Sequence, residues 1–289
     1  MEHPRITVVT PSYNQAQFLE ETILSVVGQQ YPNLEYIVMD GGSTDGSVEI
    51  IRKYERHLTY WTSGPDGGQS AAINRAFGMA TGDILCWLNS DDMYLPGALS
   101  HVAARLDARR AELLFGNCVR VSEDEPDSSF GSHVRREHER RNLLLADYII
   151  QPSSFWTREA WLKTGALDES LVFGFDWEWF TRAFKAGVAF KPDDKYLSVY
   201  RIHRGHKTGT GGARRLGELA AIYARHAGPQ YGQLFERCCA LRRRLDFSRG
   251  LIRRLRLGRF EWPLLRVVFP GTFRGFSDAE AEDIMYMTY

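Results

Sequence analysis

Short apolar runs alternate with amphipathic segments over the first hundred residues of the chain. The runs predict buried strands, and the amphipathic segments, whose apolar side chains recur every three or four positions, predict helices. Because consecutive parallel strands need a helical crossover, this alternation indicates a mostly parallel sheet whose strand ends meet along one edge. The predicted strands are 6–10, 34–39, 60–62 and 83–88, and the predicted helices are 18–29, 69–79 and a segment that begins near residue 48.

The pattern continues less regularly beyond residue 95. A polar, charge-rich stretch at 122–141 has little periodicity, and we expect it to be a mobile loop. From about residue 212 onward only helical patterns follow. We therefore predict an α/β catalytic domain at 1–210 and a helical C-terminal extension at 211–289. The other predicted elements are helices at 96–107, 158–163 and 176–185 and strands at 112–121 and 196–200.

The composition is that of an ordinary soluble globular protein, with 44% apolar and 25% charged residues. No run reaches the roughly 18 apolar residues that a membrane span needs, and the N-terminus lacks the apolar region of a signal peptide. We therefore expect a cytoplasmic protein. Cys86, Cys118, Cys238 and Cys239 show no paired metal-ligand spacing, so we interpret them as reduced and mostly structural.

The formal net charge of zero conceals an uneven distribution. Residues 1–100 carry twelve acidic and five basic side chains, a charge of −7, whereas residues 237–274 carry eleven arginines and two acids, a charge of +9. The arginines alternate with apolar residues, which favours a surface helix on anionic lipid and a peripheral position at the inner face of the membrane. A solvated helical face packed on the domain, or on another subunit of a homo-oligomer, explains the pattern equally well. Nucleic acid is disfavoured as a partner, because the acidic sheet edge has no matching basic groove.

Two adjacent carboxylates and an amide follow the fourth predicted strand. Asn89, Ser90, Asp91 and Asp92 come directly after it. Adjacent carboxylates repel one another, and the usual reason to tolerate them is a hard divalent cation such as Mg²⁺ or Mn²⁺ bound to diphosphate oxygens. The alternative is a helix N-cap at Asp92, since a helix is predicted just beyond it. A cap explains one acid but not two acids with Asn89, so the segment favours a metal.

Polar residues and glycines follow the other three strands as well. After the first strand, Pro11 stops the sheet ladder and Tyr13 either stacks on a flat base or packs on the next helix. Asp40 ends the second strand, where it can accept hydrogen bonds from a base or ribose, whereas Asp45 is better explained as an N-cap. Asp66 follows the third strand and either makes a turn or binds sugar hydroxyls.

Taken in order, these strand ends resemble the motifs of family 2 glycosyltransferases with the GT-A fold. The likeness covers roughly residues 5–205, and four ordered motifs are far more specific than any one of them. It implies a metal-dependent, inverting transfer of a sugar from a nucleotide diphosphate, with a UDP-sugar as the expected donor. The motifs are Thr10-Pro-Ser-Tyr-Asn-Gln, Asp40-Gly-Gly-Ser-Thr-Asp-Gly, Asp66-Gly-Gly-Gln and Trp87-Leu-Asn-Ser-Asp-Asp.

The resemblance also assigns roles to individual residues. It implies that Tyr13 and Asp40 hold the base, that Asp66 holds the ribose or donor sugar, and that Asp91 binds the metal. Asn89 departs from the family pattern, because it stands where the Asp-x-Asp motif often has its first Asp. Asp92 is therefore a rival metal ligand. Pro11, Asn89 and Ser90 belong to the same expected donor-binding loops.

A second acidic pair suggests the catalytic base, which must take a proton from the acceptor hydroxyl. On a helix Asp176 and Glu178 point about 200° apart, so only one of them can face the active edge. Asp176 aligns with the catalytic base of the glycosyltransferase family that the chain resembles. The aromatic residues next to Asp176 are of a kind that stacks on sugars. The alternative role of Asp176 is an N-cap, and Glu178 is the reserve candidate for the base.

The last predicted strand leads into a basic cluster at 200–207. His203 matches a histidine of the resembled family that reaches the metal or phosphate, and Lys207 adds a positive charge. Such donors offset the negative charge that develops on a leaving diphosphate. A structural role is the alternative for each.

These observations together predict an inverting glycosyltransferase that uses Mg²⁺ or Mn²⁺. The expected acceptor is a saccharide or a lipid-linked saccharide in surface polysaccharide or glycoconjugate assembly, a context that rests on the resemblance alone. The rival functions are a sugar nucleotidyltransferase, which would be expected to have a basic, glycine-rich phosphate loop after the first strand, and a non-catalytic module that binds nucleotide sugars.

Overall fold

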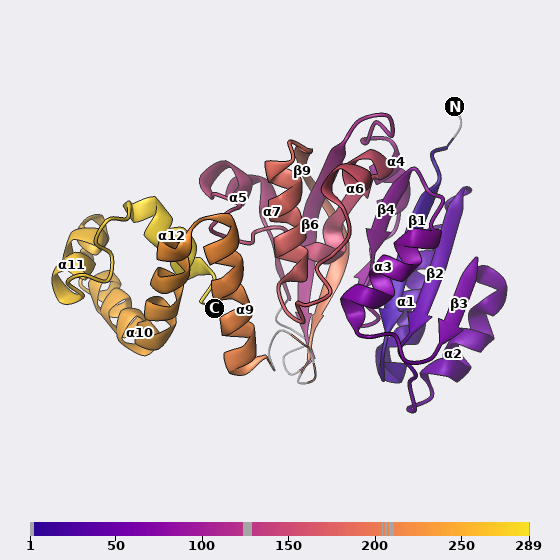
Figure 1. The fold of residues 1–289 in the computed structure, drawn as a ribbon, viewed down its shortest axis with the longest axis horizontal. Coiled ribbons are helices and arrows are strands. Elements are labelled where there is room, and N and C mark those ends of the chain that lie inside the picture. Colours follow the sequence, from indigo (N-terminus) through magenta and orange to yellow (C-terminus); the bar gives the residue numbers. More distant parts are fainter. Residues whose placement is uncertain (1–2, 124–128, 204, 206, 208–210, 289) are drawn as a thin grey trace. The chain divides into compact units, whose positions relative to one another are not determined.

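The computed structural model describes residues 3–123, 129–203, 205, 207 and 211–288, and its chain divides into two compact units (Figure 1). The first unit comprises Met1–Glu137 and Ile149–Thr210, and the second comprises His138–Tyr148 and Gly211–Tyr289. The unit that contains residues 211–289 thus also includes a segment, 138–148, that the sequence pattern had not separated from the α/β domain.

A nine-stranded mixed sheet forms the centre of the first unit. The strands are β1 (Ile6–Ser12), β2 (Leu34–Asp40), β3 (Tyr60–Ser63), β4 (Ile84–Trp87), β5 (Met93–Tyr94), β6 (Glu112–Ser122), β7 (Ser129–Gly131), β8 (Ser154–Thr157) and β9 (Ala189–Ile202). They are ordered β3-β2-β1-β4-β8-β6-β9-β5, and β7 pairs with β6. The first four run parallel, as predicted, while β8 lies antiparallel between β4 and β6. We call the edge where β1, β2, β3 and β4 end the carboxyl edge.

Helices cover both faces of this sheet (Figure 1). One face packs apolar side chains of α1, α2 and α4 against alternate strand residues such as Val8, Val38 and Cys86. The opposite face carries an aromatic layer, in which Trp87 and Trp156 lie 5.2 Å apart and Trp156 and Trp179 lie 4.7 Å apart between ring centroids. Cys86 and Trp87 serve opposite faces because successive strand side chains alternate. The helices are α1 (Ala16–Val27), α2 (Ser47–Tyr54), α3 (Gln69–Met79), α4 (Ala98–Ala103), α5 (Val134–Arg140), α6 (Arg158–Thr164) and α7 (Phe175–Lys185), with 3-10 turns at η1 (Glu55–His57) and η2 (Gln151–Ser153).

Two sequence predictions about elements were wrong. The expected mobile loop at 122–141 contains strand β7 and helix α5, because residues 129–131 pair with β6; residues 124–128 of that prediction lie outside the described residues. The last strand is also longer than the predicted 196–200. Its polar first half pairs with β6 through register shifts near Asn117, and such irregular pairing leaves no alternating pattern to detect.

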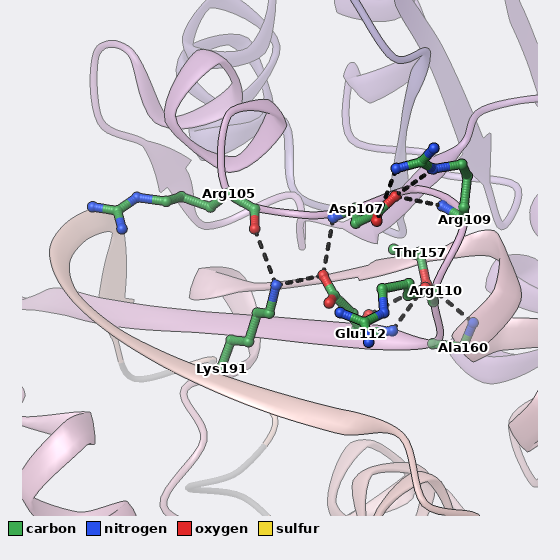
Figure 2. Close-up of polar contacts among 8 residues, drawn as sticks. All are labelled: Arg105, Asp107, Arg109, Arg110, Glu112, Thr157, Ala160 and Lys191. Carbon is green, nitrogen blue, oxygen red and sulfur yellow. Dashed lines mark hydrogen bonds and ion pairs between the residues drawn. The ribbon is translucent and has the colours of Figure 1, made fainter.

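Buried charges at the opposite, amino edge of the sheet are paired and therefore structural. Figure 2 shows the cluster where β6 begins. Glu112 is 2% exposed, and its Oε2 accepts hydrogen bonds from Lys191 Nζ at 2.6 Å and from the Asp107 N–H at 2.9 Å. The Thr157 hydroxyl oxygen accepts from the N–H groups of Glu112 and Ala160, and it caps α6. A buried carboxylate with these donors stabilises the fold and needs no ligand.

A second buried glutamate at this edge gives a prediction about stability. Glu35 accepts hydrogen bonds from the Thr7 hydroxyl at 2.5 Å and from the N–H and hydroxyl of Thr81, each at 2.7 Å. Burial alone would raise the pKa of Glu35, but these hydrogen bonds and the charge of Arg5 outweigh it and hold the pKa below its ordinary value. The depressed pKa contributes stability that is fully present above the ordinary pKa of a glutamate and is lost as pH falls through the folded pKa.

We therefore expect Glu35→Gln to lower the free energy of unfolding at pH 7 by about 1–3 kcal/mol, since an amide leaves some of these donors without an acceptor. The difference from the wild type should shrink as pH falls below the ordinary pKa of a glutamate, because the unfolded wild-type chain then takes up a proton more readily than the folded one, whose Glu35 pKa is lowered. Urea unfolding at pH 7 and at pH 3.5 measures both effects. Glu55→Gln, at an exposed glutamate, is the matched control. Equal stabilities of the Glu35→Gln variant and the wild type at pH 7 would contradict the prediction.

The second unit is helical. Gly228 precedes Pro229, whose fixed φ suits the first position of a helix, and a capping box at Ser277 begins the last helix. The segment 138–148 is tied to these helices, because Tyr223 donates to the Leu145 carbonyl at 2.6 Å and Asp283 accepts from Arg141 at 3.0 Å. Among the described residues, no helix is both long and apolar enough to cross a membrane. The helices are α9 (Gly212–His226), α10 (Pro229–Arg254), α11 (Glu261–Val268) and α12 (Asp278–Tyr286), with a 3-10 turn at η3 (Gly258–Phe260).

Candidate active site

The parallel register brings three strand ends together at the carboxyl edge. Ser12 pairs with Asp40, and Asp40 pairs with Ser63. Asp40 is 1% exposed; its Oδ2 accepts from the Ser63 hydroxyl at 2.6 Å and from the Ser43 N–H at 2.9 Å, while its Oδ1 accepts from the Ser43 hydroxyl at 2.5 Å. The carboxylate thus fixes the turn after β2 to the end of β3. Direct contact between Asp40 and a base stays a prediction.

Tyr13 and Asp66 meet across a glycine. A Cβ at Gly41 would lie 3.3 Å from Cδ2 of Tyr13 and 3.1 Å from Oδ2 of Asp66, so the three residues are packed side by side. The Tyr13 ring is nevertheless 63% exposed, which leaves a face for a flat ligand. Asn14 adopts a left-handed φ of 50°, and its N–H donates to the Ser43 hydroxyl at 2.8 Å, so the loop that presents Tyr13 is held in place.

Asp91 and His203 come from distant segments and form a pair. Nε2 of His203 lies 3.1 Å from Oδ2 of Asp91. The histidine side chain is 3% exposed and its ring packs on Phe18 at a centroid distance of 4.6 Å, whereas the Asp91 side chain is 19% exposed. Thr22 of α1 donates to the Asp92 and Ser90 carbonyls at 2.8 and 3.0 Å and positions the loop. The packing of His203 and the hydrogen bonds of Thr22 therefore hold Asp91 Oδ2 and His203 Nε2 in fixed positions beside each other.

The neighbouring Asp92 points elsewhere. It is 1% exposed, its Oδ1 accepts from the Arg201 N–H at 3.1 Å, and its buried Oδ2 has no hydrogen-bond partner among the described residues. Burial, and then the charge of Asp91, raise the pKa of Asp92 well above its ordinary value. The two adjacent acids thus have different surroundings: the Asp91 side chain is partly exposed and contacts His203, whereas Asp92 is buried and ties the loop to β9.

The Asp91 and His203 pair fits a divalent cation that is shared with a ligand. Among the described residues, no group of three or more His, Cys, Asp or Glu side chains could hold a metal ion by itself. Mg²⁺ and its relatives are commonly held by one or two protein side chains, with substrate phosphates and waters as the remaining ligands. An oxygen and a nitrogen 3.1 Å apart match that kind of site.

Four side chains form a chain of hydrogen bonds beside this pair. Lys207 Nζ donates to Gln69 Oε1 at 2.7 Å, Gln69 Nε2 donates to Asn89 Oδ1 at 2.8 Å, and Asn89 Nδ2 lies 3.4 Å from Gln151 Oε1. Gln151 in turn donates to the Trp87 carbonyl at 2.9 Å. The sequence analysis gave no role to Gln69, although this residue ends the Asp66-Gly-Gly-Gln motif. It also gave none to Gln151 and Thr22, because neither residue lies in a recognised motif. The relay fixes Asn89 and Lys207 at the same edge.

Asp176 stands in the first turn of α7, whose N-cap position is occupied by Gly174 with a φ of 64°. The alternative role of Asp176 as the N-cap is therefore excluded. Its half-buried carboxylate accepts from the Trp177 N–H at 2.9 Å. The preceding residue, Phe175, packs on Trp87 at a centroid distance of 6.0 Å and lies 5.2 Å from Lys207 Nζ. These contacts place the start of α7 beside the end of β4.

Other predicted site residues have structural partners. Glu178 is 1% exposed, and both of its oxygens accept from Nε of Arg182 at 2.9 Å. The positive charge of Arg182 therefore balances the buried negative charge of Glu178. The aromatic neighbours of Asp176 are buried, so the expectation that they stack on a sugar was wrong: Phe175 is 6% exposed, and Trp177 and Trp179 fill the core beneath α7. Asp45 has a structural role, because it accepts from the Ser47 N–H and from the first N–H of α1. It is not the predicted N-cap, since Gly46 occupies the N-cap position of α2.

The remaining expectations concern loop backbone. Pro11 does not end the first strand, since β1 continues to Ser12 with Pro11 opposite Met39. Ser90 is 5% exposed and contributes its carbonyl to Thr22. In the basic cluster, Arg201 pairs with Glu21 at 2.6 Å, and residues 204 and 206 lie outside the described residues.

Comparison with known proteins agrees with this geometry. Residues 7–165 match the model of glycosyl transferase family 2. The chain belongs to this family. The match contains the ends of β1, β2, β3 and β4, the loops that carry Tyr13, Asp66 and Asp91.

Relatives and solved structures extend the likeness. An uncharacterized glycosyltransferase of Rickettsia typhi is 26% identical over 76% of this chain and 71% of its own length. A GalNAc(5)-diNAcBac-PP-undecaprenol beta-1,3-glucosyltransferase of Campylobacter jejuni is 27% identical over 50% of this chain and 49% of its own.

Two solved structures share the fold. TarS 1–349 of S. aureus, in complex with UDP, has a TM-score of 0.61 and 19% identity over 77% of this chain and 65% of its own. The mannosyltransferase PcManGT from Pyrobaculum calidifontis, in complex with GDP-Man and Mn²⁺, has a TM-score of 0.60 and 21% identity over 78% and 64%. The first unit of the chain therefore has the GT-A fold, and the helical second unit follows it.

Proposed function

We propose that the protein transfers a sugar, with inversion, from a nucleotide diphosphate sugar to a hydroxyl group of a saccharide or lipid-linked acceptor in glycoconjugate assembly. The observation that carries the proposal is the convergence at one sheet edge of an exposed ring (Tyr13), a carboxylate beside it (Asp66), the Asp91 and His203 pair and the first turn of α7 with Asp176. UDP is the first candidate nucleotide, because the resembled motifs and the UDP complex of TarS both point to it.

Different residues bind different parts of the donor. The exposed face of Tyr13 stacks on the base, and Asp66 accepts hydrogen bonds from vicinal hydroxyls of the ribose or sugar. Asp91 and His203 hold Mg²⁺ or Mn²⁺, which supplies positive charge to the diphosphate oxygens when bound. Lys207, fixed by Gln69, adds a second positive charge on the same side.

Asp176 carries out the proton transfer. The acceptor oxygen forms a bond to the anomeric carbon while the bond from that carbon to the diphosphate oxygen breaks, and the carboxylate of Asp176 takes the hydroxyl proton. Attack opposite the leaving group inverts the configuration. Glu178 is not assigned this role, since Arg182 neutralises it within the protein.

A panel of UDP-, GDP-, CDP- and dTDP-sugars with Mn²⁺ tests the function. At a concentration about 100 times Kd a donor stabilises its protein by about 2.7 kcal/mol, which corresponds to a rise in Tm of about 5–10 °C for a domain of this size. We expect at least one UDP-sugar to produce this shift and to release UDP when an acceptor is present. Pyrophosphate release from a nucleotide triphosphate and a sugar phosphate would indicate a nucleotidyltransferase instead. A thermal shift with no release of nucleotide diphosphate under any acceptor would indicate a binding module.

A further inference from the structure

Large apolar side chains lie exposed on the second half of α10 and on α11. Phe247 is 73% exposed and Val267 is 77% exposed, and Leu251 and Val268 are exposed by about half of their surface. Isolated exposed apolar side chains are ordinary, but a contiguous set indicates a surface that another partner covers.

The exposed residues of α10 form one stripe. Phe247 and Leu251 are four positions apart and therefore lie on the same side of the helix. The buried residues Leu245 and Ile252 lie on another side, since Phe247 is about 200° around the helix from Leu245. The apolar stripe is thus additional to the face that α10 uses for its own core, and the fold of the unit does not account for it.

Two arginines border the apolar stripe at a hollow in the surface. The hollow has a volume of about 340 Å³ and is lined by Arg243, Arg244, Phe247, Ser248, Val268 and Phe269. Arg244 lies 5.7 Å from the Phe269 ring, and neither Arg243 nor Arg244 has a carboxylate partner among the described residues. By contrast, Arg249 and Arg266 of the same helices are paired with Glu261 and Asp278. We call the set Arg243, Arg244, Phe247, Leu251, Val267 and Val268 the α10–α11 surface.

We propose that the α10–α11 surface binds a bilayer that contains anionic phospholipid. Exposed Phe, Leu and Val side chains enter the boundary between headgroups and acyl chains, while unpaired arginines contact the phosphates at the level of the headgroups. The hollow brings both kinds of group to one place, with two guanidinium groups beside an apolar wall. A second copy of the same surface is a poorer partner, because it would place the unpaired arginines of both copies against one another.

Vesicle co-sedimentation of the full chain tests the proposal without donor or acceptor. Vesicles of phosphatidylcholine alone are compared with vesicles that contain 30% phosphatidylglycerol. Each arginine near an anionic surface contributes about fivefold to binding, so we expect Arg243→Ser/Arg244→Ser to weaken binding to the anionic vesicles by about 25-fold. Phe247→Ser/Val267→Ser should weaken it as well, and neither double variant should lower Tm, since the altered side chains are exposed.

The matched control removes two exposed arginines from the first unit, as Arg52→Ser/Arg75→Ser, and should bind like the wild type apart from a small effect of net charge. The proposal is overturned if the wild type does not bind the anionic vesicles, or if the Arg243→Ser/Arg244→Ser variant and the control bind equally. It is also overturned if Phe247→Ser/Val267→Ser converts a dimer into a monomer in sedimentation velocity while vesicle binding is unchanged, since a second copy would then be the occupant. Because no nucleotide sugar is present, this outcome is independent of the proposed glycosyl transfer.

Discussion

Replacing Asp176 by asparagine is expected to lower kcat by about 10²–10⁴, the usual contribution of a positioned general base. The amide has nearly the same shape and can still accept the Trp177 N–H, but it cannot take the proton of the acceptor hydroxyl. Since Asp176 acts on the acceptor, the Kd of the donor should remain within about twofold of the wild-type value. Initial rates of nucleotide diphosphate release and calorimetric titration with donor measure the two effects separately.

The control for this variant is Glu159→Gln. Glu159 stands in the first turn of α6 as Asp176 stands in the first turn of α7, so both changes remove a negative charge near a helix N-terminus. Glu159 is exposed and follows β8 at the amino edge. Equal effects of the two substitutions on kcat would mean that the loss reflects helix electrostatics. An unchanged kcat in the Asp176→Asn variant would remove Asp176 from the mechanism altogether.

The sequence predicts the half of the sheet in which each strand is short and buried. The apolar run that contains Cys86 and Trp87 could be recognised as a strand because both faces of the sheet are covered. The carboxyl ends of β1, β2, β3 and β4 then had to meet along one edge, as the parallel pairing confirms. The position of β8 between β4 and β6 could not be predicted, because pairing between distant strands depends on tertiary contacts that leave no periodic signal.

The candidate site was predictable where a side chain follows a strand directly. Asp91 and His203 were proposed from separate motifs, and the structure brings them to 3.1 Å of each other. Burial was the property that the sequence concealed. Asp92 looks equivalent to Asp91 in the chain, yet one faces the edge and the other faces the Arg201 N–H. Trp177 resembled a sugar platform but fills the core. Such differences depend on which way each side chain points, and the turn at Ser90 and Asp91 has no regular periodicity from which that direction could be predicted.

Replacing Asp91 by alanine is expected to abolish the dependence of donor binding on a divalent cation. Removing a residue that only hydrogen-bonds to a metal ligand commonly lowers metal affinity by about 10–100-fold. Removing the ligand itself should lower metal affinity at least as much. In the wild type, EDTA should weaken donor binding, whereas in Asp91→Ala donor binding should already be weak and unaffected by EDTA. Calorimetry with the donor, and electron paramagnetic resonance of Mn²⁺ with and without donor, measure affinity and metal binding directly.

The adjacent acid provides the control for the Asp91 variant. In Asp92→Asn the side-chain oxygen can still accept the Arg201 N–H, so the loop should keep its position and donor binding should remain sensitive to EDTA. If Asp91→Ala retains a wild-type response to EDTA while Asp92→Asn loses it, the buried acid is the ligand and the loop must turn over when the donor binds. If neither variant nor the wild type responds to EDTA, charge on the diphosphate is balanced without a metal. Lys207 and His203 would then be the groups that balance the charge of the diphosphate. Gln69 holds Lys207 at the carboxyl edge, and Asp91 holds His203 there.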